Sequence, residues 1–411
     1  MKLRFKRWIK RGAIALLSFW LVIAFWQAAV VYPQAADTEN SEIRGIWITD
    51  AASALMYTST RLDEVLANLA KHHLNTLYPA VWDRGYTLYP SKVTPKVGGA
   101  RRDPLLAIPL LPFQDALAGM VHQAHRQHLR LIPWFEYGLG IPASSPIAVA
   151  HPDWLTTNQA GALVANPLTP DARLPKPLQN LQLELSGGNW AWLNPCHPEV
   201  QTFLTDLIID VVQRYDVDGI QLDDHFGLPV DFGYDAYTVG LYQQQHGGAS
   251  PPSDVRNEEW VAWRAGHITA LFEKISTAVK AAKPNMVVSL SPNPPDFSYR
   301  EYLQDWPMWV RQGWVDEVIV QVYRDLAESF NNSLYNDGYA ELNQVVPVGI
   351  GLYTGPFLEA KPIEHLAEQV AAVKAAGYRG VAFFSWETTL WVFKHGAREA
   401  IEQRFQTLFP R

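Results

Sequence analysis

Two adjacent aspartates and a histidine, Asp223, Asp224 and His225, close a short β-rich stretch over Gly219–Phe226. Because side chains alternate along a strand, Asp223 and His225 should point away from the apolar residues of this stretch. Asp224 has the opposite parity, but at a twisted strand end it can still reach the same space. Burying two carboxyl groups and an imidazole costs free energy, so their presence together indicates a chemical task. Two carboxyl groups are what hydrolysis of a glycosidic bond requires, whereas the three groups together can also ligate a divalent cation.

Carboxyl groups also end several of the other β-rich stretches. The third and eighth stretches end in Glu136 and Glu387, and the second ends in Asp83. We expect Asp223 to act as nucleophile or base in a two-carboxylate mechanism. Asp224, Glu136 and Glu387 compete for the role of proton donor. Strand alternation and the aromatic residues of the stretches predict the side chains that hold the substrate: Trp47, Asp50, Trp82, His225, Asn293, Gln321, Tyr323, Tyr353 and Trp386.

The composition favours a carbohydrate ligand over a nucleic acid. The chain of 411 residues contains 16 tryptophans, and flat aromatic rings suit the apolar faces of sugars, although a tryptophan-rich core is the alternative. A net charge of −7 argues against a general nucleic-acid binder, which would present a basic face. A single cysteine, Cys196, excludes a disulfide framework and a cysteine-based zinc site. We expect no cofactor and no metal requirement.

From Arg44 onward the chain alternates β-rich runs with helix-length amphipathic stretches. Eight such alternations predict the α/β class and a (β/α)8 TIM barrel with long βα loops. The alternative, an open doubly wound sheet, would carry a glycine-rich phosphate loop after its first strand, and none is present. The predicted strands are Arg44–Asp50, Asn75–Trp82, Arg130–Tyr137, Gly219–Phe226, Met286–Asn293, Glu317–Tyr323, Val346–Tyr353 and Gly380–Glu387. The predicted helices include Arg61–His72, Gln114–Leu129, Val200–Tyr215, Trp260–Ala282 and Ile363–Ala375.

Two long stretches, Leu139–Pro195 and Gly227–Asp254, follow the third and fourth predicted strands. In a barrel they are βα loops, on the face where the carboxyl ends of the strands carry the chemistry. Long loops on one face are what a cleft for a polymer requires. We therefore expect an irregular, loop-built wall beside the candidate carboxyl groups.

The first 36 residues predict export. Residues 2–11 carry six Lys and Arg side chains and no acidic one, an apolar run follows, and small residues end at Gln34-Ala35-Ala36. These are the parts of a secretory signal peptide. Left uncleaved, residues 8–31 are long enough to tether the protein to a membrane with the remainder outside the cytoplasm. We therefore expect a signal peptide or anchor over residues 1–36, a barrel domain over residues 41–411, and a location in the periplasm or cell envelope, either released or held at the inner membrane.

Several motifs resemble the bacterial glycosyl-hydrolase-like 10 family. The most specific is D-G-I-x-x-D-D-x-F at Asp218–Phe226, supported by Ser291-Pro292 and by Q-x-Y at Gln321–Tyr323. The resemblance runs from Ser41 to the C-terminus. It implies a (β/α)8 barrel that acts as a glycosidase on peptidoglycan glycan strands.

Residue by residue, the resemblance makes Asp223 and Asp224 the family's aspartates. The chain departs from the family's pattern at Glu136, where many members carry asparagine. We therefore expect an exported glycoside hydrolase whose partner is a bacterial envelope polysaccharide. The alternatives are a catalytically silent envelope glycan-binding protein, which needs the aromatic cleft without facing carboxyl groups, and a metal-dependent polysaccharide deacetylase, which needs three converging ligands.

Overall fold

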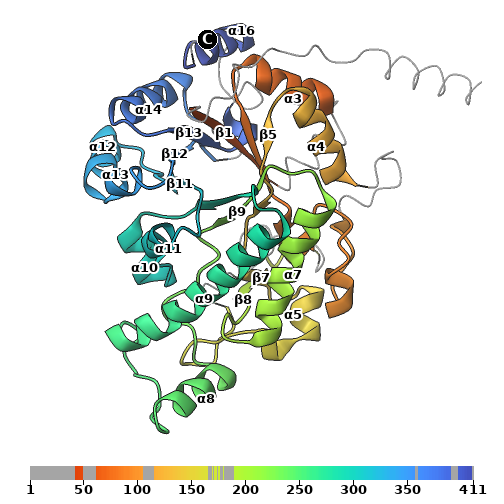
Figure 1. Cartoon of the computed structure of the whole chain (residues 1–411), viewed down its shortest axis with the longest axis vertical. Helices are drawn as coiled ribbons and strands as arrows, with labels where there is room; N and C mark the ends of the chain where they lie inside the picture. The colour runs from red at the N-terminus through yellow and green to blue at the C-terminus, as the bar shows by residue number, and fades with distance from the viewer. Residues whose placement is uncertain are drawn as a thin grey trace, which may run out of the picture.

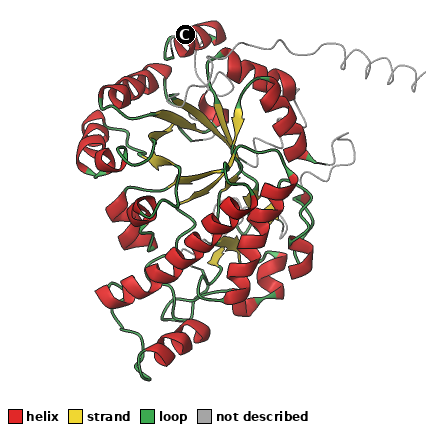
Figure 2. Cartoon of the chain, viewed as in Figure 1, coloured by secondary structure: helices red, strands yellow, loops and turns green. Residues whose placement is uncertain are grey.

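Eight β-rich stretches of the sequence form the parallel strands of one sheet, and helices cover its outer face (Figures 1 and 2). The computed structural model describes residues 42–49, 62–104, 115–164, 189–356, 360–389 and 397–409, with 169, 171–173, 175 and 179. The order of the sheet is β5-β2-β1-β13-β12-β11-β10-β9-β6. Its strands are β1 (Ile43–Ile48), β2 (Thr76–Pro79), β5 (Arg130–Leu131), β6 (Trp134–Phe135), β9 (Gly219–Asp223), β10 (Val287–Ser291), β11 (Glu317–Gln321), β12 (Val348–Tyr353) and β13 (Gly380–Phe384).

The third predicted strand, Arg130–Tyr137, is where the barrel closes. Pro133 has no N–H to donate, and it separates β5, which pairs with β2, from β6, which pairs with β9. Trp134 forms a parallel bridge with Ala80, and the Val81 amide donates to the Trp134 carbonyl over 2.8 Å. Both edges of the sheet therefore belong to one stretch of chain, and the expected (β/α)8 barrel is confirmed.

The predicted helices lie between the strands, with ends that differ by a few residues. For example, α7 begins at Pro198, a favourable first position because its missing N–H needs no partner, and it buries Phe203, Leu207 and Val211. In Figure 1, α3 and α4 lie on one side of the barrel and α12, α13 and α14 on the opposite side. The helices that cover the sheet are α3 (Leu62–Lys71), α4 (Ala116–Arg126), α7 (Pro198–Arg214), α9 (Glu258–Ala282), α11 (Trp306–Arg311), α12 (Ala327–Asn336), α13 (Tyr339–Leu342), α14 (Ile363–Ala375) and α16 (Arg398–Gln406).

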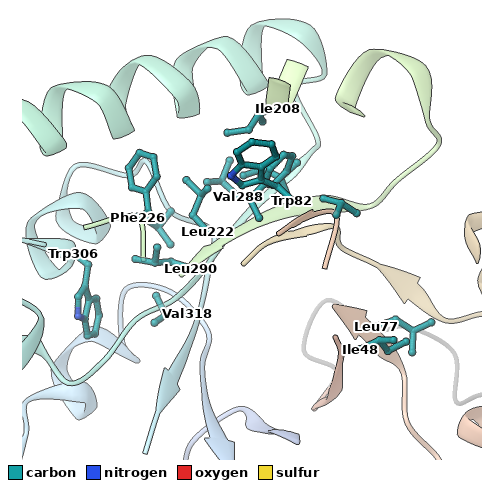
Figure 3. Close-up of a cluster of buried hydrophobic side chains, with 14 of the residues drawn as sticks. Ile48, Leu77, Trp82, Ile208, Leu222, Phe226, Val288, Leu290, Trp306 and Val318 are labelled. Atoms are coloured by element: carbon teal, nitrogen blue, oxygen red, sulfur yellow. The ribbon is translucent and has the colours of Figure 1, made fainter. Parts of the chain in front are cut away.

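Side-chain alternation divides the core into two layers. Ile220 and Leu222 of β9 belong to the large apolar cluster between strands and helices, part of which Figure 3 shows. Gln221, between them, points into the barrel, where its side chain accepts a hydrogen bond from Trp47 Nε1 over 2.8 Å. The alternation predicted for the fourth strand is therefore confirmed up to Asp223.

The barrel interior is filled by a chain of polar contacts and aromatic rings. Glu317, at the start of β11, accepts hydrogen bonds from Arg130 (2.7 Å), Tyr78 (2.9 Å) and Ser289 (3.1 Å). Next to this cluster, Trp47 needs the space left by Gly351, because a Cβ at that glycine would lie 3.1 Å from the indole. The buried Glu317 carboxylate is thus paired and hydrogen-bonded, as a charge in a barrel interior must be.

Secondary structure extends beyond the strands at their carboxyl ends, and part of it lies in the two stretches predicted to be irregular loops, Leu139–Pro195 and Gly227–Asp254. An antiparallel pair joins β7 to β8, and a second joins β3 to β4. The elements of this face are β3 (Trp82–Asp83), β4 (Tyr86–Thr87), η1 (Thr94–Val97), β7 (Gly140–Pro142), α5 (Pro146–Ala150), η3 (Pro152–Trp154), β8 (Trp190–Trp192), α8 (Ala236–Gln245), α10 (Pro295–Tyr302) and α15 (Trp386–Thr389). These elements surround the carboxyl ends of the strands with ordered walls.

The predicted export segment over residues 1–36 and the candidate residue Asp50 lie outside the described residues. Within the described part of the chain, no helix has the length and apolar character needed to cross a membrane.

Candidate active site

Asp223 is the last residue of β9, and its carboxylate is fully engaged inside the protein. Oδ1 accepts a hydrogen bond from the His225 amide over 2.9 Å, and Oδ2 accepts one from Trp134 Nε1 over 3.1 Å. Gln304 donates to the Asp223 backbone carbonyl over 2.7 Å, which fixes the strand end. The Asp223 side chain is only 1% exposed, so it holds its neighbours in place more readily than it meets a ligand.

Asp224 is the carboxylate that reaches the surface of this site. Asn293, which follows β10, donates a hydrogen bond to Oδ2 over 2.9 Å, and Gln321, at the end of β11, donates to Oδ1 over 3.0 Å. The Asp224 side chain is 14% exposed. Two amide donors from two neighbouring strands fix the orientation of the carboxylate.

His225 lies against both carboxylates. Its Nδ1 is 3.5 Å from Asp223 Oδ2 and 3.4 Å from Asp224 Oδ1. Burial opposes a charge on the ring, but Asp224 and Asp223 outweigh it and raise the pKa of His225 to about 9. Burial also raises the pKa of Asp223 to about 7, although the His225 cation opposes the shift. At neutral pH, therefore, an imidazolium lies between the two carboxyl groups.

The same three residues are the candidate holders of a metal ion. Asp223, Asp224 and His225 each offer a ligand atom, and these atoms lie within 4.8 Å of one another, the only such group of three found among the described residues. Carboxylates and imidazoles are common ligands of divalent cations, so these residue types fit a metal ion. A metal ion would need His225 in its neutral form, however, whereas here His225 Nδ1 faces both carboxylates as in an ion pair. The three side chains can therefore either hold a cation or pair with one another.

Glu136 directly follows β6 and lies in a turn at the carboxyl ends of the strands. The β6–β9 register pairs Trp134 with Gln221 and Phe135 with Leu222, and β6 ends there. Glu136 is buried, and its charge contributes to the raised pKa of Tyr323, as the charges of Asp224 and Asp223 do. Glu136 thus adds a further carboxyl group to the strand ends, near Asp224 and Asp223.

Aromatic rings form a wall around these carboxyl groups. Tyr137 stacks on Trp190 at 4.0 Å between ring centroids and lies 4.7 Å from the His225 ring. Tyr323 packs against Phe384 at 5.9 Å, and burial together with the charges of Asp224, Asp223 and Glu136 raises its pKa well above the usual value. Tyr353 packs on Tyr323 at 5.5 Å. The expected aromatic lining is present, but tyrosines supply most of it.

Comparison with known proteins agrees with this geometry. Residues 42–371 match the profile of the family described as Glycosyl hydrolase-like 10. The chain belongs to this family. Glycosyl hydrolase DigH of Escherichia coli K12 is 24% identical over 354 residues, 72% of this chain and 69% of that protein. Glycosyl hydrolase YngK of Bacillus subtilis 168 is 22% identical over 353 residues, 77% of this chain and 60% of that protein.

Solved structures share the fold of this glycosyl hydrolase-like 10 protein. The PgaB (BpsB) glycoside hydrolase domain from Bordetella bronchiseptica superposes with a TM-score of 0.60 at 14% identity, covering 89% of this chain and 99% of that one. α-L-Fucosidase isoenzyme 2 from Paenibacillus thiaminolyticus gives 0.58 at 15% identity, covering 89% of this chain and 49% of that one. At these identities the likeness shows the barrel, while membership of the family supports a hydrolase-like role on glycans.

The three tryptophans predicted to hold the substrate are buried. Trp47 lies inside the barrel next to Gly351, and Trp82 packs in the outer layer near Ile208, against Phe203 at 5.8 Å (Figure 3). Trp386 is also buried. Their rings fill core volume, so none of the three presents an exposed ring on which a sugar could stack.

Glu387 lies in α15 and not at a strand end as predicted. Its Oε1 accepts a hydrogen bond from Thr49 over 2.6 Å, and its Oε2 accepts one from the Ser385 hydroxyl. These contacts belong to β1 and β13, and neither involves Asp223 or Asp224. The structure therefore brings Asp223, Asp224, His225, Asn293 and Gln321 into direct contact and does not add Glu387 to them.

Asp83 lies close enough to the site to act on His225, although no sequence pattern distinguishes it from the other strand-end acids. Its Oδ2 accepts a hydrogen bond from Arg84 over 3.1 Å, while its Oδ1 is buried without a hydrogen-bond partner. Burial raises the pKa of Asp83 to about 6, and its charge contributes to the raised pKa of His225. The signal in the sequence was its position at the end of the second predicted strand.

Proposed function

We propose that this protein is an exported glycoside hydrolase that cleaves the glycosidic bonds of a bacterial envelope polysaccharide, with peptidoglycan glycan strands as the first substrate to test. The observation that carries the proposal is the Asp224 carboxylate, held by Asn293 and Gln321 and partly open to solvent, with the buried Glu136 close enough to act, as Asp224 does, on the pKa of Tyr323. Membership of the family and the names of its relatives support a glycan substrate.

In the proposed mechanism Asp224 is the ionised carboxylate, and the imidazolium of His225 stabilises its charge. Glu136, buried beside Tyr137 and Tyr323, is the proton donor. The glycosidic C–O bond breaks, and the leaving oxygen takes the proton from Glu136. Asp224 either bonds to the anomeric carbon or takes a proton from the attacking water.

Asp223 has a different role in this mechanism from the one expected from the sequence. Its carboxylate is buried and already accepts hydrogen bonds from Trp134 and His225. We therefore assign it to positioning His225, and we assign the contact with substrate to Asp224. Turnover of variants at the two positions distinguishes these roles, because a variant of Asp223 keeps the reacting carboxylate of Asp224 and a variant of Asp224 does not.

The proposed location follows from the N-terminal sequence. Six basic residues, an apolar run and the small residues ending at Gln34-Ala35-Ala36 support export. Cell fractionation combined with mass spectrometry of the N-terminal peptide tests this. We expect the protein in the envelope fraction, either cleaved after this segment or intact and membrane-bound. The full-length chain in the soluble cytoplasm would contradict export.

The activity test uses purified glycan strands freed of peptides, incubated with the protein and assayed for new reducing ends. We expect reducing ends from these strands and none from soluble plant polysaccharides. Binding of the strands without release of reducing ends would contradict the hydrolase and favour the alternative of a catalytically silent glycan-binding protein. A metal-dependent deacetylase remains the second candidate because Asp223, Asp224 and His225 can together hold a cation. It predicts acetate release that a chelator abolishes and zinc restores.

A further inference from the structure

A second pocket opens on the same face of the barrel as Asp224. It has a volume of about 230 Å³ and lies between β8, the residues that follow β9, and α10. Trp192, Phe297 and Tyr302 supply aromatic surface, and Asp231 and Glu301 supply carboxylates. A pocket of this size holds about one sugar ring and not an extended peptide.

The lining of this pocket is suited to a pyranose. Phe297 is 47% exposed, an unusual position for a phenylalanine that no part of the described protein covers. Trp192 is only 8% exposed, and its buried Nε1 has no hydrogen-bond partner. An aromatic face can pack on the C–H face of a sugar ring, while carboxylates accept hydrogen bonds from hydroxyl groups at its edge.

The loop that follows β9 and the Asp224 site is hydrogen-bonded to the end of α10, which lines the pocket. The Leu228 amide donates to the Tyr302 carbonyl and the Val230 amide to the Glu301 carbonyl, each over 2.9 Å. Gly227 allows this approach, because a Cβ there would lie 2.6 Å from the Tyr302 carbonyl oxygen. Burial raises the pKa of Tyr302, and the charge of Asp224 adds to the shift, so this side chain lies within electrostatic reach of both sites.

The walls of the pocket are rigid. Arg264 is buried and donates through one guanidinium nitrogen to the carbonyls of Val230 and Phe232, and its cation lies 4.6 Å from the ring centroid of Trp260. The loop after β9 is thus held by the hydrogen bonds from Arg264 and by those that its own amides donate to the carbonyls of α10. A pre-formed pocket loses little entropy when a ligand enters it.

The charge of the pocket restricts which sugar it takes. Asp231 and Glu301 are both acidic, and Arg256 partly offsets them through an ion pair with Glu301 at 2.8 Å on the exposed side. A sugar ring that carries its own carboxylate meets two like charges here. An uncharged ring does not.

We propose that this pocket is a sugar subsite that binds an uncharged pyranose ring of the same polysaccharide chain whose bond is cleaved at Asp224. The inference rests on the proposed function. The protein then binds its polysaccharide both at the Asp224 site and in this pocket, so its affinity for the polysaccharide increases with the length of the chain.

The test measures binding by calorimetry, with the Asp224→Asn variant so that hydrolysis does not interfere. The probes are the N-acetylglucosamine hexamer and dimer, both uncharged, and the galacturonic acid hexamer, which is anionic. Phe297→Ala is introduced into this background, and Tyr335→Ala, which removes an exposed aromatic ring on α12, is the matched control. Loss of one stacked ring should weaken binding of the hexamer by about tenfold.

We expect Phe297→Ala to weaken binding of the uncharged hexamer but not of the dimer, Tyr335→Ala to change neither, and the anionic hexamer to bind more weakly than the uncharged one. Equal affinity of Phe297→Ala and Tyr335→Ala for the uncharged hexamer would overturn the subsite, as would absence of hexamer binding. Binding is measured without turnover, so the two proposals can fail separately. A wild-type protein that binds the hexamer through Phe297 but releases no reducing ends would contradict the proposed hydrolase activity and still support the sugar subsite.

Discussion

Gln321 donates a hydrogen bond to Asp224 over 3.0 Å, although 97 residues and the whole of β10 separate the two. The contact forms because β9, β10 and β11 are consecutive strands whose carboxyl ends meet at one edge of the barrel. Asn293 approaches the same carboxylate from the strand between them. Three strands therefore fix the position of one acid, which is the precision that catalysis requires.

Gln321→Glu should impair this site while preserving side-chain size. The new carboxylate lies where an amide now donates to Asp224, so two like charges meet and the ionised form of Asp224 is disfavoured. We expect kcat/KM to fall by about 10- to 100-fold and the acidic limb of the pH profile to move to higher pH. Steady-state kinetics across pH checks this, with the exposed Gln344→Glu as the matched control. An unchanged pH profile would contradict the role given to Gln321.

The stability of the protein should fall as pH rises through the range in which His225 titrates. The folded protein holds the His225 proton more tightly than the unfolded chain does, because the pKa rises from 6.5 to about 9. This contribution is fully present below about pH 6.5 and is lost as pH rises through 9. Titration of Asp223 also lowers the stability of the folded protein as pH rises, but between about pH 4 and pH 7, because folding raises its pKa from 3.8 to about 7.

Urea unfolding at a series of pH values measures this dependence. Between pH 6.5 and 9 the free energy of unfolding should decrease in the wild type and decrease less in His225→Gln. Equal slopes in the two proteins would show that the imidazole is not held as a cation between Asp223 and Asp224.

Arg130→Met should destabilise the barrel. Arg130 lies at the start of β5 and pairs with the buried Glu317 of β11 over 2.7 Å, so its removal leaves a carboxylate unpaired inside the protein. We expect a loss of about 3 kcal/mol in the free energy of unfolding. Arg173→Met, which removes an exposed partner of Asp171, is the control and should leave the unfolding curve unchanged. If the two variants unfold at the same urea concentration, the buried pair does not hold the barrel together.

Much of the fold was predictable because period-two alternation survives in almost every strand. The apolar positions of β9, β10 and β11 face the helices as expected, and Gln221, Ser289 and Ile319 face the interior. The third and eighth strands were the exceptions, because their parity could not be deduced from the sequence. In the third, Pro133 interrupts the pairing, and Glu136 lies in the turn that follows the strand.

The candidate site was predictable to the level of residues but not of roles. Strand-end position identified Asp223, Asp224, Asn293 and Gln321, which do meet. Which aspartate is buried depends on contacts from distant residues such as Trp134, and no local pattern contains that information. The role of the tryptophans could not be predicted for the same reason, because an indole ring is suited both to a protein core and to the face of a sugar. Trp82, for example, packs against Phe203 of α7.

The most direct test of the account compares Asp224→Asn with the matched variant Asp216→Asn, which changes an exposed aspartate away from the site. Asparagine keeps the size of Asp224 and one of the two oxygens that accept hydrogen bonds from Asn293 and Gln321, but it removes the charge. We predict that release of reducing ends from peptidoglycan glycan strands falls by at least about 10³-fold in Asp224→Asn, with an unchanged melting temperature, and that Asp216→Asn retains wild-type turnover. Near-normal turnover in a folded Asp224→Asn protein would contradict the assignment of Asp224 as the reacting carboxylate.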